Sequence, residues 1–147
     1  MSRLSSLILT MADDLPSFAE SISRLMSEGW VVNINKEIIY LIDQSDDFDW
    51  KSTTDSVSDV LARLEKHFKK GDRVGLTINW QRESKVSVDL IVQLHSDTQF
   101  VFGAERMVID HKVEFTDVSW YIRHLIIPVV TGLNKPRVTS ISWIEDI

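Results

Sequence analysis

The sequence contains no cysteine, only five glycines and three prolines, and no long hydrophobic run. The lack of cysteine excludes disulfides, thiolate zinc sites and cysteine nucleophiles, and it fits a reducing compartment such as the cytoplasm. The glycines do not cluster, so a phosphate-cradling glycine loop and the dinucleotide-binding fingerprint are absent. The longest apolar run, residues 125–130, is far shorter than the roughly 20 residues that cross a bilayer. We therefore expect a cytoplasmic protein without membrane segment, signal peptide or cofactor.

A basic surface is missing as well. The net charge is −6, and residues 37–59, with seven acidic residues and one basic residue, carry this whole excess. Binding of nucleic acid requires lysine and arginine to neutralise phosphates, so we expect no nucleic-acid partner. A concentrated negative charge instead favours a basic protein surface and speeds its capture.

The remaining composition is that of one globular domain spanning residues 1–147. Hydrophobic residues make up 44% of the chain and charged residues 26%, which is typical of a folded protein. Strand-like runs occur at 4–11, 30–34, 37–43, 73–80, 85–95, 100–102, 107–115 and 137–144, and three stretches with helical spacing interrupt them. Because strands mostly follow strands, the pattern predicts an α+β fold. We expect an antiparallel sheet of about five to seven strands with three helices, mostly packed on one face.

Capping residues predict where the three helices begin. The first is expected to start after Asp13-Asp14 at Pro16 and to end at Gly29. The expected caps are Thr53 or Thr54 for the second helix and Thr116 or Asp117 for the third. Pro128 lies within the third helix and is expected to kink or shorten it.

The most unusual stretch is LIDQSDDFDWK, residues 41–51, and we call residues 43–50 the acidic loop. Four aspartates and two aromatic residues are interleaved there: Asp43, Asp46, Asp47, Phe48, Asp49 and Trp50. As a calcium loop that starts at Asp43, it has Phe48 where the sharp turn needs glycine and Thr54 where a bidentate glutamate is needed. We therefore expect no calcium site. The loop is either a hydrated connection pinned to the core by its aromatic residues or a partner-binding surface, and aromatic residues flanked by charge favour the second interpretation.

No residue pattern specifies an active site. The four histidines, His67, His95, His111 and His124, are not arranged at metal-ligand spacing within one element. The sequence lacks the nucleophile motif of serine hydrolases. Carboxylates in a hydrated loop lack the burial that shifts a pKa to a catalytically useful value. We therefore expect neither a metal site nor an enzyme.

Two segments near the end of the chain carry a family resemblance. The sequences TDVSWYIRHL, residues 116–125, and ISWIEDI, residues 141–147, with a break at Gly132 between them, resemble the ending of small bacterial immunity proteins. The small, acidic, cysteine-free α+β profile is also similar to that family, whose members accompany polymorphic toxins, including contact-dependent inhibition systems. The resemblance implies a cytoplasmic, non-enzymatic protein that binds one cognate toxin domain and blocks its active site. If the toxin is a nuclease, the resemblance implies a basic partner, because toxin nucleases commonly are basic in order to hold nucleic acid.

The predicted partner-binding surface combines the acidic loop with the start of the second helix. It comprises Asp43, Asp46, Asp47, Asp49, Trp50, Asp55 and Asp59. Two other functions stay open. A secretion chaperone would bind an effector segment in an apolar groove as a homodimer, and a small-ligand or catalytic domain would need an enclosed cavity. Trp80, His95 and Trp120 are the candidates for lining such a cavity, and the sequence does not specify the oligomeric state.

Overall fold

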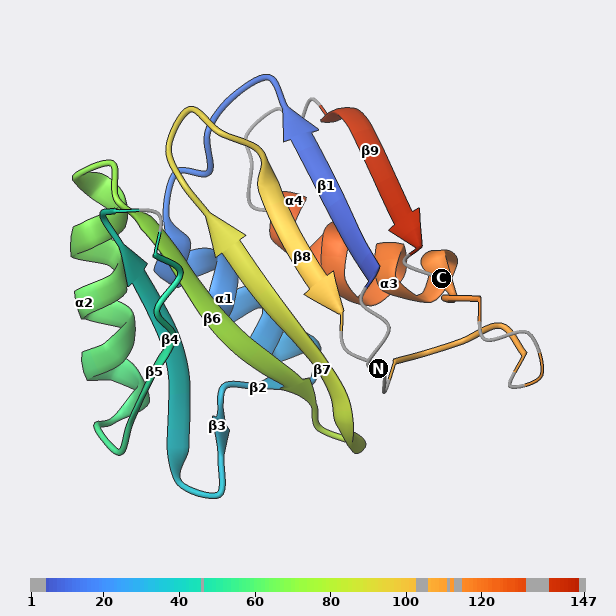
Figure 1. Ribbon diagram of the computed structural model, residues 1–147, viewed down its shortest axis with the longest axis horizontal. Helices are drawn as coiled ribbons and strands as arrows, with labels where there is room; N and C mark the ends of the chain where they lie inside the picture. Colours follow the sequence, from blue (N-terminus) through green and yellow to red (C-terminus); the bar gives the residue numbers. More distant parts are fainter. Residues whose placement is uncertain are drawn as a thin grey trace.

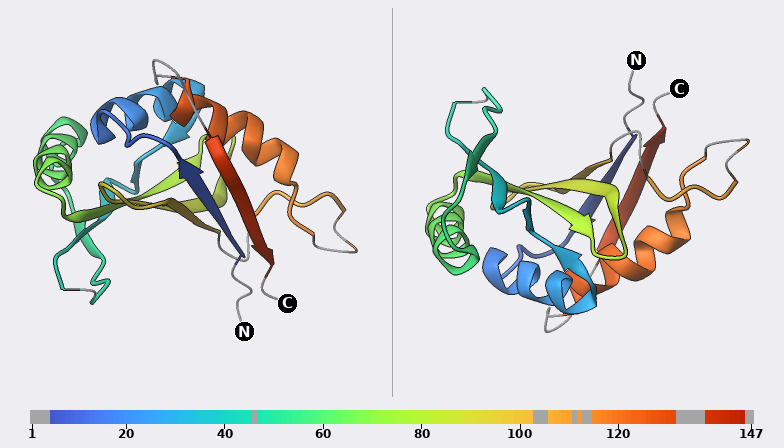
Figure 2. Two further views of the ribbon diagram at one scale, coloured as in Figure 1. Left: turned by 90° about the horizontal axis from the view of Figure 1, so that it is seen from above. Right: turned by 90° about the horizontal axis from the view of Figure 1, so that it is seen from below.

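The computed structural model describes residues 5–45, 47–102, 106–110, 112, 115–131 and 138–145. Within these residues an open antiparallel sheet of nine strands carries three helices on one face, which confirms the expected α+β class (Figures 1 and 2). The strands are β1 Ser5–Met11, β2 Trp30–Val31, β3 Asn33–Ile34, β4 Glu37–Asp43, β5 Lys51–Thr53, β6 Arg73–Trp80, β7 Glu83–Val92, β8 Thr98–Phe102 and β9 Val138–Glu145. The helices are α1 Phe18–Glu28, α2 Val57–Lys69 and a third, continuous helix made of α3 Val118–Tyr121, the π-helical turn η1 Ile122–Ile126 and α4 Ile127–Val130.

The order of the strands places the acidic loop and the last strand, β9, at opposite edges of the sheet. The main path is β3-β4-β6-β7-β8-β1-β9, with β2 paired to β6 and β5 paired to β4. The first strand is therefore inserted between β8 and the last strand, and β9 forms one edge (Figure 1). The acidic loop and the short strand β5 lie at the other edge. The structure has nine described strands where about five to seven were expected, because the run at 30–34 forms two short strands, β2 and β3, and because the acidic loop leads into the additional strand β5.

The core lies between the sheet and the helices. On β7, Val86, Val88 and Leu90 alternate with less buried residues, so the period-two pattern of the sequence marks the buried face correctly. The buried side chains of the two long helices are Phe18, Ile22 and Leu25 on α1 and Val60, Leu64 and Phe68 on α2. Each set recurs every three or four residues, which is the spacing of one helical face.

Of the two expected effects of Pro128, a kink or a shortening of the third helix, the shortening is wrong, because the helix continues past Pro128 to Val130. Proline has no N–H to donate to the carbonyl of His124 four residues earlier, and its ring crowds that carbonyl. The chain widens into the π-helical turn η1 just before Pro128 and then continues to Val130. The indole N–H of Trp30 donates to the His124 carbonyl at 2.8 Å, in place of the bond that Pro128 cannot make.

Several expected boundaries differ from the structure. Ser17 caps α1 and Ser56 caps α2, each accepting a hydrogen bond from a backbone N–H three residues later, so the expected caps at Asp14 and at Thr53 or Thr54 are wrong. Thr53 instead belongs to β5. Asp117 caps α3 as expected. The described part of the run 107–115 forms no strand, only one bridge between residues 108 and 116.

Candidate functional site

The acidic loop connects β4 to β5 and projects from the face of the sheet opposite the helices (Figure 2). Strand β5 pairs with β4 from Tyr40–Lys51 to Ile38–Thr53, so the chain reverses direction at the end of β4. Asp46 lies outside the described residues. The other residues of the loop divide into those that hold it to the sheet and those that it exposes.

Asp43 is the internal support of the acidic loop. Its side chain is 2% exposed, and its Oδ2 accepts an ion-paired hydrogen bond from the Arg73 guanidinium at 2.9 Å. Its Oδ1 accepts hydrogen bonds from the backbone N–H groups of Ser45 at 3.3 Å and Asp47 at 3.2 Å. The structure therefore places Asp43 beneath the predicted surface rather than on it. The carboxylate fixes the loop and is not presented to a partner.

Trp50 anchors the other end of the acidic loop. A Cβ placed on Gly75 of β6 would lie 2.9 Å from Cη2 of Trp50, which shows that the indole ring rests directly on this glycine. The same Cβ would lie 3.1 Å from the carbonyl oxygen of Leu90 and 3.2 Å from Cβ of Leu41. An isolated glycine in a strand often marks such a close approach, and that signal is visible in the sequence. Trp50 thus packs against the sheet and is only partly exposed.

Replacing Gly75 with alanine is expected to lower the free energy of unfolding by about 1–3 kcal/mol, because the new methyl group must displace the Trp50 ring. The measurement is urea denaturation of the single variants Gly75→Ala and Trp50→Ala and of the double variant. The double variant should lose less stability than the sum of the two single losses. Strictly additive losses would show that Trp50 does not rest on Gly75.

Phe48 is the aromatic residue that the acidic loop exposes. Its side chain is 43% exposed, and its backbone has φ +48°, a conformation that bulky residues rarely adopt. The guanidinium of Arg73 lies 4.7 Å from the centre of the ring, so a cation–π contact helps to hold the residue there. Arg73 therefore contacts both Asp43 and Phe48. The sequence does not reveal this role, because the pairing of β4 with β6 is a long-range contact.

Two of the predicted acidic residues, Asp47 and Asp49, are exposed on the acidic loop. The hydroxyl of Ser45 donates to Oδ2 of Asp47 at 2.7 Å, which orients that carboxylate while leaving it in solvent. Together with Phe48, which lies between them in the sequence, they give the tip of the loop two exposed carboxylates and one exposed aromatic ring. This group of side chains can contact a cationic and partly apolar surface.

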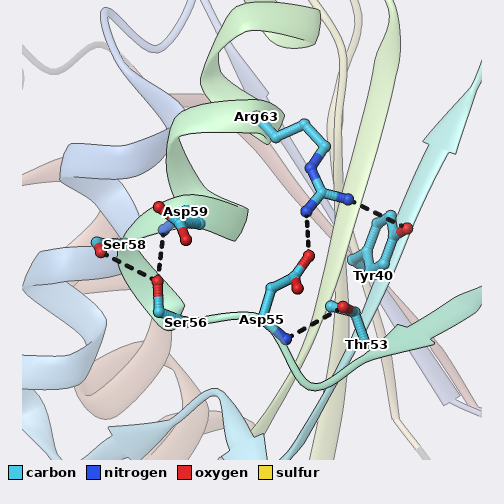
Figure 3. A network of polar contacts seen from close by, with 7 residues as sticks. All are labelled: Tyr40, Thr53, Asp55, Ser56, Ser58, Asp59 and Arg63. Carbon is cyan, nitrogen blue, oxygen red and sulfur yellow. Dashed lines mark hydrogen bonds and ion pairs between the residues drawn. The ribbon is translucent and has the colours of Figure 1, made fainter.

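Asp55 and Asp59 do not join this group. They follow β5 and begin α2, whereas the acidic loop precedes β5, so the two sets lie at opposite ends of the β4–β5 pair. Figure 3 shows their surroundings: Arg63 donates to Asp55 at 2.7 Å and lies 3.5 Å from the Tyr40 hydroxyl. The backbone N–H of Asp59 donates to Ser56, within the cap of α2 (Figure 3). The predicted surface is therefore two separate acidic sites.

Trp80, His95 and Trp120 do not line a common cavity. The rings of Trp80 and Trp120 pack edge to face, with centroids 5.1 Å apart. His95 lies beyond the far end of β7, beside a cavity of about 430 Å³ that is also lined by Asp13, Asp14 and Asp97. Its backbone N–H donates to Oδ1 of Asp14 at 2.7 Å, which ties the β7–β8 turn to the segment after β1.

The titratable pairs of the described residues are dispersed over the molecule. His67 lies 2.7 Å from Asp72, and this hydrogen bond is the main reason why the pKa of Asp72 is lowered. Burial raises the pKa of Asp89, an effect that the hydrogen bond from the Thr77 hydroxyl at 2.7 Å partly offsets. Within the described part of the chain, no group of three or more histidine or acidic side chains is placed to hold a metal ion. His111 lies outside the described residues.

Comparisons with models of protein families, with curated proteins and with solved structures found no match to this chain. Among the helices that the structure describes, none combines the length and the apolar character needed to span a membrane. The geometry and charge of the chain's own residues are therefore what bear on its function.

Proposed function

We propose that the protein is a non-enzymatic binding protein that recognises a basic partner protein through the tip of the acidic loop. The observation that carries this proposal is that some residues of the acidic loop anchor it to the sheet while others stay exposed to solvent. Asp43 and Trp50 hold it against the sheet from within, while Asp47, Phe48 and Asp49 stay exposed. A surface that is already formed before binding loses less conformational entropy when a partner docks.

The charge of this region supports a basic partner. Residues 37–59 carry seven acidic residues against one basic residue. Arg73 and Arg63 pair with Asp43 and Asp55, whereas Asp47 and Asp49 stay exposed, so we expect a negative field around the loop tip. Such a field attracts a positively charged protein and raises its association rate, while an aromatic side chain at the centre supplies apolar contact area. Phe48 fits that second role because it is exposed between the two carboxylates.

Within this class, we infer that the protein is an immunity protein of the cytoplasm. Its partner would be a cognate toxin domain, a basic nuclease whose active site the bound protein occludes. Two features support this assignment: the resemblance of residues 116–125 and 141–147 to the ending of such proteins, and an exposed acidic loop whose carboxylates resemble the charge of nucleic acid. Occlusion requires no catalytic residue in the inhibitor.

Replacing Asp47 and Asp49 together with asparagine is expected to slow association with the partner about tenfold at low ionic strength and to flatten its dependence on salt. The tagged wild-type chain would first be purified from its native host at low salt, and a stoichiometric basic protein identified. Association rates would then be measured by stopped-flow fluorescence at several salt concentrations. Inhibition of the nuclease activity of that partner, measured with equimolar protein, tests the proposed occlusion.

The matched control is the variant with Asp55 and Asp59 replaced by asparagine, which removes the same amount of charge at the other acidic site. At about 0.1 M salt it should slow association less than the Asp47/Asp49 variant does, because the effect of a charge then falls off over roughly 10 Å. Equal slowing of both variants would show that only net charge matters. Unchanged kinetics in the Asp47/Asp49 variant would exclude the loop tip as the binding surface.

A further inference from the structure

Strand β9 is an open edge of the sheet. It is eight residues long and pairs only with β1, and among the described residues no strand lies on its other side. Its register sets Ile141 opposite Leu9 and Ile144 opposite Ser6, so the two isoleucines lie on opposite faces of the sheet. The backbone groups along the outer side of such a strand are available to pair with another strand.

The opposite edge of the sheet is protected, and β9 is not. There the outermost strand is β5, which has only three residues including Lys51 and pairs with the side of β4 that faces away from β6. Short strands and lysine are the usual means by which proteins prevent edge-to-edge association. In β9, none of the residues Val138–Ile144 is charged or a proline. The contrast between this long edge strand and the protected opposite edge indicates that β9 serves a contact.

Exposed apolar side chains gather on the same side of the molecule. Of the nine large hydrophobic side chains that are exposed in the described residues, five lie on β9 or in the segment between β8 and α3: Ile109, Phe115, Val138, Ile141 and Ile144. The described residues of that segment lie on the side of the molecule where β9 ends (Figures 1 and 2). A backbone hydrogen bond from Ile109 to Phe115, at 2.9 Å, joins its two arms. Soluble monomers rarely concentrate exposed apolar groups in this way.

We propose that β9 pairs antiparallel with β9 of a second copy of this chain, forming a homodimer with one continuous sheet. The strand is self-complementary about Ile141: a two-fold axis at this residue aligns Ile141 with its own counterpart and Ser140 with Ser142 of the other copy. Paired positions point to the same face of a sheet, so the central isoleucines contact each other. No charged residue lies between Val138 and Ile144, so two copies of an otherwise acidic protein can approach here without like charges meeting.

The chemistry of this interface sets its strength and its response to salt. A single strand pair lies at the small end of interfaces, below about 1,200 Å², so the dimer is expected to have a Kd of about 1–100 µM. Each copy has a net charge of −6, and the copies therefore repel each other at long range. Salt screens that repulsion and strengthens the dimer, whereas salt weakens binding of a basic partner to the acidic loop. The two interactions are thus distinguishable, and they use opposite edges of the sheet.

Sedimentation velocity of the full chain tests the dimer, from about 1 µM to about 300 µM protein in about 50 mM and about 500 mM NaCl. The wild type should convert from monomer to dimer as its concentration rises, and at lower concentration in high salt. Ile141→Lys should weaken the dimer at least about tenfold. The control is Ile39→Lys on β4, because Ile39 is 41% exposed and Ile141 is 42% exposed. It should dimerise like the wild type.

Ile144→Lys provides a second variant on the other face of β9, and circular dichroism checks that each variant is folded. A wild-type chain that stays monomeric at the highest concentration in high salt overturns the proposal. A dimer that both β9 variants leave intact, or that Ile39→Lys weakens equally, also overturns it. A loss confined to the β9 variants supports it.

Discussion

Replacing Trp30 with alanine is expected to lower the free energy of unfolding by about 3–5 kcal/mol. The side chain is 1% exposed, and its ring lies 5.2 Å from that of Trp80 and 6.0 Å from that of Trp120, centroid to centroid. Alanine would leave a large cavity among side chains that the surrounding sheet and helix hold in place. Urea denaturation followed by far-ultraviolet circular dichroism measures the loss, since this signal does not depend on the removed indole.

A hydrogen bond adds to the packing contribution of Trp30. Its indole N–H donates to the carbonyl of His124, the residue that loses its usual helical donor because position 128 is proline. The variant Trp30→Phe keeps most of the ring but not the donor, and it should cost about 1–3 kcal/mol. The difference between the two variants separates the cavity from the hydrogen bond.

The exposed position Ile39 provides the baseline for this comparison. Ile39→Ala should change stability by no more than about 0.5 kcal/mol, as substitutions at exposed positions usually do. If Trp30→Ala lowered the free energy of unfolding no more than Ile39→Ala does, Trp30 would not pack closely against Trp80 and Trp120. If Trp30→Phe matched the wild type, the bond to the His124 carbonyl would contribute nothing to stability.

The fold was predictable from the sequence wherever local periodicity and burial agree. On β7, every second residue from Val86 to Leu90 is buried, and on α2 the buried residues recur at helical spacing. Both patterns arise from the geometry of the elements themselves, so they are visible without knowledge of the neighbours. The hairpin turn at Asn35 and Lys36 was predictable for the same reason, and both residues adopt the positive φ that tight hairpin turns require.

Features that depend on distant partners were not predictable. Residues 51–53 have no strong strand pattern and form β5 only because β4 offers its free edge to them. The third helix continues past Pro128, and Trp30, which lies nearly one hundred positions earlier, donates a hydrogen bond to the carbonyl of His124 that Pro128 cannot reach with an N–H group. Local rules describe neither case, since both depend on which segments the sheet brings together.

The candidate site was predictable in composition but not in arrangement. The density of aspartates identified the acidic loop, yet the sequence did not show that Asp43 faces inward or that Asp55 and Asp59 lie beyond β5. The role of Arg73 is not visible in the sequence, because its contacts with Asp43 and Phe48 depend on the pairing of β4 with β6. Gly75 was the available clue to the position of Trp50, because a lone glycine within a strand indicates close approach of another group.

Replacing Asp43 with alanine is expected to lower the free energy of unfolding by about 3–5 kcal/mol, because it removes a buried carboxylate that accepts a hydrogen bond from Arg73. The backbone N–H groups of Ser45 and Asp47 lose their acceptor in the same step. Asp43→Asn keeps one oxygen that can accept from the N–H groups of Ser45 and Asp47, and it replaces the oxygen that faces Arg73 with an NH2 group. It should therefore cost less, about 1–3 kcal/mol. Urea denaturation of both variants measures the difference.

The substitution Asp43→Ala also tests whether the conformation of the acidic loop matters for binding. If the loop is held in its binding conformation by Asp43, then Asp43→Ala should slow association with a basic partner although the residue itself is 2% exposed. The Asp47/Asp49 variant should instead slow association while its stability stays within about 0.5 kcal/mol of the wild type. The Asp43→Ala variant could be less stable than the wild type and still associate with the partner at the wild-type rate. That result would show that the partner does not need the loop in this conformation. In that case the aspartates would act through their charge alone, and the exposed Phe48 would lose its proposed role as an anchor.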